Sequence, residues 1–370
     1  MQQRVIISQD IEHDLAQAIA ETEHDRVFVL TDDITQECCL PKVAALLTKH
    51  NATTITIRHD DTNKTLDTLA DVWTALQRGG ATRHSLLVNL GGGMVTDLGG
   101  FAAATFKRGI HFINIPTTLL AMVDAAVGGK TGINFGGLKN EVGAFANARY
   151  VIVNTCFLDT LDTANLCSGY AEMLKHSLIS NAQMWAEHVN FDILQPDLAE
   201  LQSMVAASIA VKEHIVADDP HEHGIRKALN FGHTIGHALE EFSMQQPGGA
   251  VVSARLLPLA RARTAPKNTL LHGYAVAFGL IGELYISARK AGFPTARLHQ
   301  TARFIRENYG AVAFTCDDYP TLLNLMRHDK KNTSDTINFT LLHDIGDIRI
   351  NQTATDEEIR EALDFIREGY

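Results

Sequence analysis

Four polar side chains that could form a binding or catalytic site occur in the short stretch RKALNFGHTIGH: Arg226, Asn230, His233 and His237. The apolar residues between them predict a helix over residues 226–242. At about 100° per residue, this spacing places the four side chains within an arc of roughly 60° on one helix face. A stripe of one guanidinium, one amide and two imidazoles is typical of a site rather than of a packed face. Two histidines four positions apart can share a metal ion, or one can bind metal while the other acts on a substrate, and the pattern is compatible with either arrangement.

A second group of reactive side chains precedes this stretch. Tyr170–Ile179 is predicted to be helical, and Glu172, Lys175 and His176 then share one helix face. The Glu172 carboxylate could be a third metal ligand. A Glu–Lys pair on the protein surface is the simpler alternative.

The sequence NLGGGMVTDLGG, residues 89–100, has three consecutive glycines where a predicted strand turns into a helix. Gly91, Gly92 and Gly93 allow a ligand to approach the backbone closely, and the N–H groups at the start of the helix favour an anion. Asp97 lies one turn into that helix. The spacing differs from the GxGxxG pattern of dinucleotide-binding folds, and a tight structural turn is the alternative interpretation.

A further strand end carries two hydroxyl side chains. Thr117 and Thr118 follow the predicted strand and could cap the next helix or bind a phosphate. Asp124 lies within that helix. These residues add to the anion-binding character of the N-terminal region.

Residues 127–145 form a glycine-rich segment that is predicted to be a loop and that carries Lys130 and Lys139. Its GGKT sequence is similar to the end of a P-loop, but Ala125 occupies the position of the required first glycine. A nucleoside triphosphate site is therefore excluded. Flexible glycines that carry lysines still suit an anionic group that must be surrounded.

The composition is that of a globular protein with two domains of ordinary size: 370 residues, of which 45% are hydrophobic and 20% charged. No apolar run reaches the roughly 18 residues of a membrane span, and the N-terminus lacks the features of a signal or transit peptide, so a cytoplasmic location is expected. The five cysteines form no CxxC pair, which fits a reducing compartment. The formal charge of −11 argues against nucleic acid or an anionic membrane as the main partner.

The predicted secondary structure that carries these residues changes near residue 159. Before it, β-branched runs alternate with amphipathic helical stretches, which predicts an α/β domain with a largely parallel sheet over residues 1–158 and ligands at the carboxyl ends of the strands. Residues 159–370 are predicted to form a mainly α-helical domain. The expected strands are Val5–Ser8, Val27–Leu30, Thr53–Arg58, Ser85–Leu90, Phe112–Ile115 and Tyr150–Val153, and the helices between them are Ile11–Glu23, Gln36–His50, Leu66–Leu76 and Val95–Phe106. The second domain is expected to contain helices at Tyr170–Ile179, Asp197–Val216, Arg226–Phe242, Tyr274–Ala291 and Ala296–Tyr309, and a hairpin of Ile337–Leu342 with Ile348–Ile350.

The segment Ser243–Leu271 is basic and contains no acidic residue. Its prolines and glycines predict an exposed loop with a short helix around Val251–Arg263. Among the described patterns it is the one with no evident chemical role.

Taken together, the motifs GGGMVTD, FKRG, PTTLLAMVDAAVGGKTG, LKN, AEMLK, GIRKALNFGHTIGHALE and HGYAVAFG closely resemble those of the 3-dehydroquinate synthase family of sugar-phosphate cyclases, over residues 26–345. The resemblance implies an N-terminal α/β NAD-binding domain, a C-terminal helical metal-binding domain, an active site between them and a homodimer. It also implies a reaction in which NAD⁺ oxidises a ring alcohol of a seven-carbon keto acid phosphate, phosphate is eliminated, the ketone is reduced again, and the ring opens and closes by aldol reaction. NAD is then needed without net oxidation.

The resemblance further implies roles for individual residues. It makes Glu172, His233 and His272 the ligands of zinc, or of cobalt, and leaves His237 on the substrate side. The implied NAD contacts are Asp32, Asp61, Lys64, Gly92, Gly93, Asp97, Thr117, Thr118, Asp124, Lys130, Lys139 and Thr160. The implied catalytic and substrate-binding residues are Lys130, Asn140, Lys175, Lys212, Arg226, Asn230, His237 and Lys330 or its neighbour Lys331, together with Arg108, which would reach into the site of the neighbouring subunit.

Two features depart from the family pattern. His233 and His272 are 39 positions apart, more than is usual, and Tyr274 replaces a common glutamate. Neither change removes an implied ligand. The alternative functions are another sugar-phosphate cyclase, a metal-dependent polyol dehydrogenase of related fold, and a non-catalytic relative that binds NAD or metal.

Overall fold

The computed structural model describes residues 3–245, 251–252, 269–328 and 336–369. The chain forms two compact units. The first comprises Met1–Leu161 and Asp197–Ile209, and the second comprises Asp162–Pro196 and Ala210–Tyr370. Within the described ranges, no helix is both long and apolar enough to cross a membrane.

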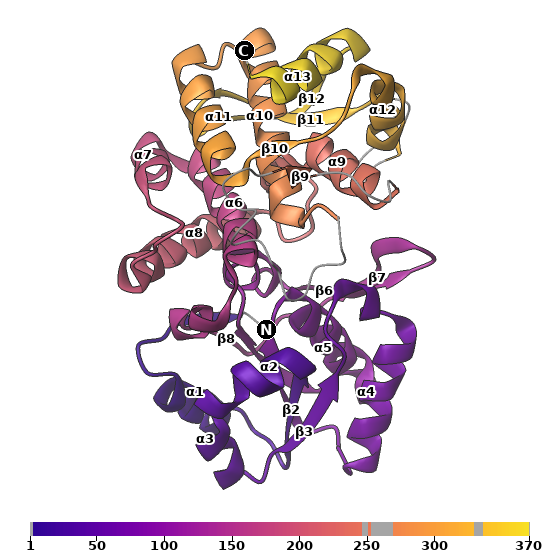
Figure 1. The fold of residues 1–370 in the computed structure, drawn as a ribbon. Coiled ribbons are helices and arrows are strands. Elements are labelled where there is room, and N and C mark those ends of the chain that lie inside the picture. The colour runs from indigo at the N-terminus through magenta and orange to yellow at the C-terminus, as the bar shows by residue number, and fades with distance from the viewer. Residues whose placement is uncertain (1–2, 246–250, 253–268, 329–335, 370) are drawn as a thin grey trace. The chain divides into compact units, whose positions relative to one another are not determined.

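The first unit is built on a six-stranded parallel sheet, as expected from the sequence (Figure 1). Its strand order is β1 (Arg4–Ile7), β8 (Tyr150–Val153), β5 (His111–Pro116), β4 (Leu86–Gly91), β2 (Val27–Asp32) and β3 (Thr53–Ile57). The strands β2, β4 and β8 are buried throughout, which explains their continuous apolar runs. All six expected strands are confirmed.

The helices of the first unit cover both faces of this sheet. Helix α1 (Ile11–Ala20) and helix α3 (Ala44–Lys49) lie on one side, and α4 (Leu66–Arg78) and α5 (Gly93–Thr105) lie on the other (Figure 1). The connections through α1 and α3 run along the sheet from β1 toward β3, and those through α4 and α5 run back toward β5. Because each crossover is right-handed, the two pairs of helices lie on opposite faces.

Two expectations for the first unit were wrong. The single helix expected over Gln36–His50 is divided into α2 (Asp33–Cys38) and α3 by a short 3₁₀ turn, Leu40–Lys42, which contains Pro41. The loop expected over residues 127–145 contains an antiparallel hairpin of β6 (Lys130–Phe135) and β7 (Leu138–Phe145). Gly136 and Gly137 form its two-residue turn with φ angles of 61° and 82°, which the short turns of hairpins favour.

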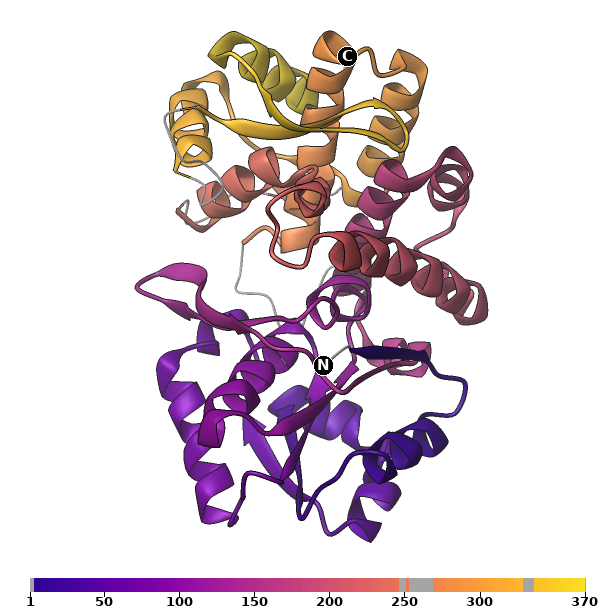
Figure 2. The same ribbon diagram turned by 180° about the vertical axis from the view of Figure 1, so that it is seen from behind.

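The second unit is mainly helical and is organised around α10 (His272–Lys290), which packs against α6 (Thr163–Ser180), α9 (His233–Gln245), α11 (Thr295–Tyr309) and α13 (Asp356–Glu368). Seen from behind, the hairpin of β11 (Asn338–Asp344) and β12 (Asp347–Thr353) runs across this group (Figure 2). The hairpin expected from the sequence is confirmed. The remaining helices of this unit are α7 (Ala182–Asn190) and α12 (Tyr319–Arg327), together with the part of α8 (Leu198–Asp218) that follows Ile209; the earlier part of α8 belongs to the first unit.

The short helix expected around Val251–Arg263 is wrong at its start, because Val251–Val252 form strand β9, which pairs with β10 (Ala311–Val312). A two-residue strand of this kind is stabilised by its pairing partner sixty positions away, which local sequence patterns do not encode. The rest of the expected helix lies outside the described residues.

The continuous helix expected over Arg226–Phe242 is also wrong. A 3₁₀ helix, Ile225–Asn230, is followed by a break at Phe231 and Gly232, and α9 begins at His233. Gly232 has a φ of 80°, which favours glycine, and its carbonyl oxygen would lie only 1.9 Å from a Cβ added at Gly279 of α10. The break is therefore set by the close approach of α10. It also removes the single helical stripe on which the four polar side chains were expected to lie.

Candidate functional site

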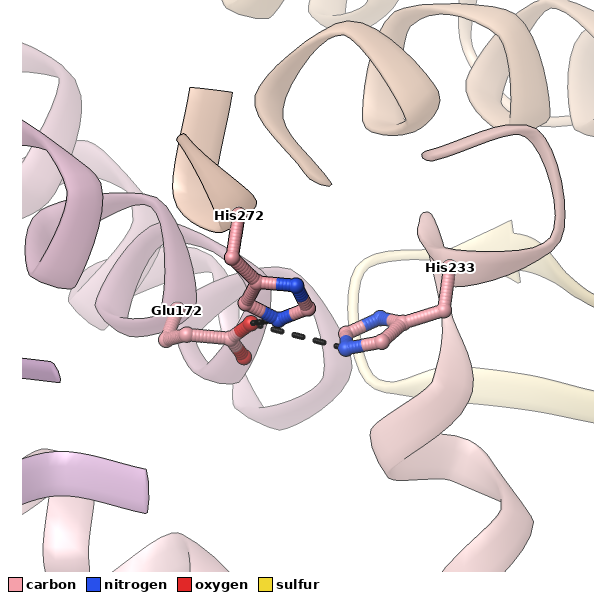
Figure 3. Close-up of side chains that lie close together, drawn as sticks. All are labelled: Glu172, His233 and His272. Carbon is pink, nitrogen blue, oxygen red and sulfur yellow. Dashed lines mark ion pairs between the residues drawn. The ribbon is translucent and has the colours of Figure 1, made fainter. Parts of the chain in front are cut away.

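Three helices of the second unit bring a carboxylate and two imidazoles together (Figure 3). Glu172 lies within α6, His233 is the first residue of α9, and His272 is the first residue of α10. The Oε1 atom of Glu172 is 3.5 Å from Nε2 of His233 and 3.4 Å from Nε2 of His272. Oxygen and nitrogen ligands about 2.0–2.2 Å from a tetrahedral zinc ion lie roughly 3.4 Å from one another, so this spacing fits a shared metal ion.

The hydrogen bonds of the two imidazoles determine which nitrogen faces Glu172. Nδ1 of His233 donates to the carbonyl oxygen of Phe231 at 3.1 Å, and Nδ1 of His272 donates to Oε2 of Glu240 at 3.0 Å. A carbonyl or carboxylate oxygen can only accept, so each Nδ1 carries the proton. In the neutral imidazoles both Nε2 lone pairs are then directed to the Glu172 oxygen, which is the arrangement required of metal ligands.

The charges around these atoms favour a cation. Burial lowers the pKa of His272, but the neighbouring Glu240 and Glu172 carboxylates outweigh that effect and raise the pKa to about 10. On α6, Lys175 forms an ion pair with Glu172, and both side chains are buried. His176, the next residue, is buried as well. A fully buried carboxylate is costly without such partners.

His237 lies beside this group, on the same helix as His233. Its ring centroid is 5.2 Å from that of His233 and 5.9 Å from that of His272. Among the described residues, the sets whose ligand atoms all lie within 4.8 Å of one another include Glu172 with His233 and His272, and none includes His237. Of the two histidines, His233 therefore belongs to the compact donor set and His237 lies beside it.

The two other residues of the expected stripe are held by the turn before α9. The Arg226 guanidinium is buried and donates to the carbonyl oxygen of Pro220 at 2.5 Å. The Asn230 amide donates to Oε1 of Glu222 at 2.6 Å. Lys212, on α8, is also buried. Lys330 and Lys331 lie outside the described residues.

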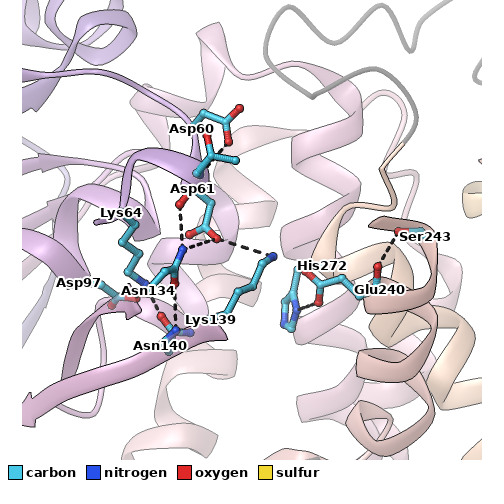
Figure 4. A network of polar contacts seen from close by, with 11 residues as sticks. Asp60, Asp61, Lys64, Asp97, Asn134, Lys139, Asn140, Glu240, Ser243 and His272 are labelled. Carbon is cyan, nitrogen blue, oxygen red and sulfur yellow. Dashed lines mark hydrogen bonds and ion pairs between the residues drawn. The ribbon is translucent and has the colours of Figure 1, made fainter. Parts of the chain in front are cut away.

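In the first unit, a polar network joins several residues that the resemblance assigns to NAD (Figure 4). Nζ of Lys64 lies 2.5 Å from both Oδ2 of Asp97 and Oδ1 of Asn140. Burial raises the pKa of Asp97, and the Lys64 ammonium opposes that rise. Lys139 is 3.7 Å from Asp61. The network therefore holds together residues from a turn, a helix and a hairpin.

The other residues assigned to NAD lie near the carboxyl ends of the strands or in the segments that follow them. Gly92 immediately precedes α5 and Gly93 is its first residue. A Cβ added at Gly92 would lie 3.0 Å from the Thr118 side chain. Thr118 Oγ1 accepts from the Ala121 N–H at 3.2 Å, so the threonine does cap a turn of helix. Asp32 caps α2 through Thr35. The remaining residues assigned to NAD in this unit are Thr117, which is buried after β5, Asp124 in a π-helical turn, Thr160 in a 3₁₀ turn and Lys130 at the start of β6. Arg108, which the resemblance assigns to the site of the neighbouring subunit, has a φ of 69°.

Three polar residues of these clusters do not emerge from the sequence patterns. Asn134 donates to Asp61 and accepts from the Asn140 N–H, so it ties the hairpin to the preceding turn. Glu240 and Glu283 contact the elements that carry the two imidazoles. Glu240 lies seven positions after His233, on the same helix face, and this spacing is a signal that could have revealed it. No local pattern distinguishes Glu283.

The fold is shared with solved structures of sugar-phosphate cyclases. A 2-deoxy-scyllo-inosose synthase crystallised with carbaglucose-6-phosphate, NAD⁺ and Co²⁺ has a TM-score of 0.80 at 22% identity, with 98% of this chain and 95% of that chain covered. The 2-epi-5-epi-valiolone synthase of Streptomyces hygroscopicus, solved with NAD⁺ and Zn²⁺ bound, has a TM-score of 0.79 at 24% identity, with coverage of 98% and 96%. An iron-containing alcohol dehydrogenase from Thermotoga maritima is less similar, with a TM-score of 0.62 at 14% identity over 98% and 97%. At these identities the likeness defines the fold class.

The sequence itself is more specific. Residues 54–168 match the profile described as 3-dehydroquinate synthase N-terminal, and residues 169–257 and 260–332 match that described as 3-dehydroquinate synthase C-terminal. The 3-dehydroquinate synthase of Parabacteroides distasonis is 50% identical over 369 residues, which cover 100% of this chain and 99% of the relative. That of Clostridium tetani is 32% identical over 92% of this chain and 86% of the relative. The chain belongs to the 3-dehydroquinate synthase family.

Proposed function

We propose that this chain is a 3-dehydroquinate synthase, a carbon–oxygen lyase of the shikimate pathway that converts 3-deoxy-D-arabino-heptulosonate 7-phosphate to 3-dehydroquinate and phosphate. The observation that carries the proposal is the convergence of Glu172, His233 and His272 in a chain with a full-length 50% identical relative of that name. A metal held by one carboxylate and two imidazoles would keep an open coordination position for the substrate.

Glu172, His233 and His272 would hold the metal, and zinc and cobalt both suit this donor set. A metal bound there would polarise the substrate ketone and lower the pKa of the neighbouring alcohol. The residues around it are suited to complementary tasks. Lys175 would balance the Glu172 charge, and His237, beside the donor set, would bind substrate or accept and return a proton.

NAD would bind in the α/β domain, proposed as residues 1–158, and the metal in the helical domain, proposed as residues 159–370. The Gly92–Gly93 start of α5 presents backbone N–H groups suited to the pyrophosphate. The proposed NAD contacts are Asp32, Asp61, Lys64, Gly92, Gly93, Asp97, Thr117, Thr118, Asp124, Lys130, Lys139 and Thr160.

The substrate carries a carboxylate and a phosphate, and cationic side chains must bind both in a protein whose formal charge is −11. Arginine binds such groups in a bidentate manner and lysine supplies a compact charge. The proposed substrate residues are Lys130, Asn140, Lys175, Lys212, Arg226, Asn230, His237 and Lys330 or Lys331.

The decisive experiment is a reconstituted reaction. The purified protein, stripped of metal with a chelator and then reloaded with zinc, is incubated with 3-deoxy-D-arabino-heptulosonate 7-phosphate and substoichiometric NAD⁺. Released phosphate, cyclised product and NADH absorbance are followed together. Phosphate and dehydroquinate in equal amounts without NADH accumulation are expected, and the stripped protein should be inactive until zinc returns.

The alternatives give different results in the same assay. Net NADH production from a polyol would indicate a metal-dependent dehydrogenase. Turnover restricted to another sugar phosphate would indicate a different cyclase. Failure to bind either zinc or NAD⁺ would indicate a non-catalytic relative.

We further propose that the enzyme acts in the cytoplasm as a homodimer in which Arg108 contributes to the site of the neighbouring subunit. All five cysteines are thiols, which suits a reducing compartment. Arg108→Ala and His237→Ala would each be inactive alone. If Arg108 acts across the dimer, random mixing of the two variants restores activity to about one quarter of the sites, because half of the dimers are mixed and each has one intact site. No restored activity in confirmed mixed dimers would contradict this role.

A further inference from the structure

Helices α9 and α10 exchange two buried carboxylates close to the two imidazole ligands. Glu240, on α9, accepts from Nδ1 of His272, the first residue of α10, at 3.0 Å (Figure 4). Glu283, on α10, accepts from the backbone N–H groups of Gly232, Thr234 and Ile235 at the start of α9, at 2.7, 2.9 and 3.3 Å. Each helix thus supplies a carboxylate to the end of the other helix that carries a proposed metal ligand.

Both carboxylates are deeply buried, with exposed fractions of 6% for Glu240 and 0% for Glu283. Burial of a carboxylate is unfavourable unless hydrogen bonds or charges compensate it. Packing alone gives no reason for these residues, because the helices already meet closely at glycines: a Cβ added at Gly279 would lie 1.9 Å from the carbonyl oxygen of Gly232. Leucine or methionine at either position would avoid the burial of a carboxylate, but it would leave His272 Nδ1 or the N–H groups at the start of α9 without their acceptor.

The position of each contact shows what it controls. The three N–H groups bound by Glu283 flank His233 on both sides, so the carboxylate determines the direction of the first turn of α9 and hence of the His233 ring. Glu240 acts on the His272 ring itself, because a proton donated from Nδ1 leaves the lone pair on Nε2, which lies 3.4 Å from Glu172.

A third contact supports the Glu240 side. Ser243 donates to the Glu240 carbonyl oxygen at 2.6 Å and accepts from the Leu270 N–H at 3.1 Å. It therefore joins the end of α9 to the residue two positions before His272. This bridge connects the chain on either side of residues 246–268, so the long sequence separation of His233 and His272 is compatible with a fixed position of His272.

We propose that Glu240 and Glu283 are positioning residues of the metal centre: Glu240 orients the His272 ring and Glu283 orients the helix start that carries His233. The proposal rests on the proposed function only in requiring that Glu172, His233 and His272 bind a metal. Carboxylates that orient metal-bound histidines are typically worth about 10–100-fold in metal affinity.

The test measures metal binding directly. Wild type, Glu240→Gln, Glu240→Ala and Glu283→Gln are stripped of metal, and their Zn²⁺ affinity is determined by competition with a chromophoric chelator. The Co²⁺ absorption spectrum of each reloaded protein reports the ligand geometry. Glu241→Gln is the matched control, because Glu241 is the exposed neighbour of Glu240 on α9. Urea unfolding of the metal-free proteins separates metal affinity from stability.

We expect Glu240→Ala to weaken Zn²⁺ binding about 10–100-fold and to alter the Co²⁺ spectrum. Glu240→Gln, which keeps an oxygen acceptor, should fall between Glu240→Ala and wild type. Glu241→Gln should match wild type. Glu283→Gln should lose affinity too, because its NH₂ group opposes N–H donors; if it does not fold, Glu283→Asp, which keeps the charge on a shorter side chain, is measured in its place.

The proposal is overturned for Glu240 if both of its variants bind Zn²⁺ as tightly as the Glu241→Gln control and give its Co²⁺ spectrum. It is overturned for Glu283 if a folded variant at that position keeps wild-type affinity. A wild-type protein that binds no stoichiometric Zn²⁺ would instead remove the metal centre itself, and with it the proposed function.

Discussion

The two histidines of α9 should respond differently to substitution, although they are only four positions apart. Nε2 of His233 lies 3.5 Å from the Glu172 carboxylate, within the compact donor set, whereas the His237 ring lies beside that set. His233→Ala should therefore remove a metal ligand. His237→Ala should leave the metal in place and remove a group that acts on the substrate.

The magnitudes follow from these positions. A partner that only orients a ligand contributes about 10–100-fold to metal affinity, so loss of the ligand itself should weaken Zn²⁺ binding by more than about 100-fold, or about 2.7 kcal/mol. His237→Ala should change the Zn²⁺ affinity by less than about tenfold. Loss of a positioned acid–base group typically lowers kcat by about 10²–10⁴-fold, which is the range expected for His237→Ala with zinc fully bound.

Both variants are stripped of metal and titrated with Zn²⁺ against a chelator, and kcat is then measured at saturating zinc. The metal-free unfolding free energy is the control for folding; His233→Ala should lose about 1 kcal/mol there, because its hydrogen bond to the Phe231 carbonyl is removed. Equal loss of Zn²⁺ affinity in the two variants would refute the reasoning, since it would make His237 a ligand.

Three further predictions concern stability and are checked by urea unfolding. Burial lowers the pKa of His188 below the usual value of 6.5, so the unfolded chain takes up a proton below that pH while the folded imidazole stays neutral. Protonation of the unfolded His188 should lower the unfolding free energy by up to about 1.4 kcal/mol per pH unit below pH 6.5. The His188→Gln variant should show a shallower decline between pH 7.5 and 5.5. An equal decline in both proteins would contradict a lowered pKa of His188. Gly279→Ala should cost at least about 1–3 kcal/mol, because its Cβ would meet the Gly232 carbonyl oxygen at 1.9 Å, and an unchanged midpoint would show that the helices separate freely. Lys64→Met and Asp97→Asn should be coupled by at least about 1 kcal/mol in a double-mutant cycle, because their side chains are 2.5 Å apart and largely shielded; additive effects would count against the pair.

Elements whose structure depends on local periodicity were predictable from the sequence. The six strands of the parallel sheet and the α4 and α5 helices follow from continuous apolar runs and amphipathic spacing, which are properties of neighbouring residues. The identity of the donor set, Glu172 with His233 and His272, followed from motifs that resemble a known family, and no single spacing would have selected it.

Elements whose structure depends on distant partners were not predictable in this way. The sequence 226–242 has a helical pattern, yet the chain breaks at Gly232 because the backbone of α10 approaches there. The hairpin of β6 and β7 required the positive φ angles of Gly136 and Gly137, which a glycine-rich sequence permits but does not demand.

Local patterns and family motifs were therefore enough to predict the parallel sheet, the mainly helical character of the later part of the chain and the residues of the donor set. Only the tertiary structure showed that the chain breaks before α9, and that Glu240 and Glu283 bind the helix starts that carry the two imidazoles. Local patterns do not encode this, because α9 and α10 exchange Glu240 and Glu283 across a helix contact. Such pairings depend on where two helices cross, and that crossing is decided by backbone approach at glycines far apart in the chain.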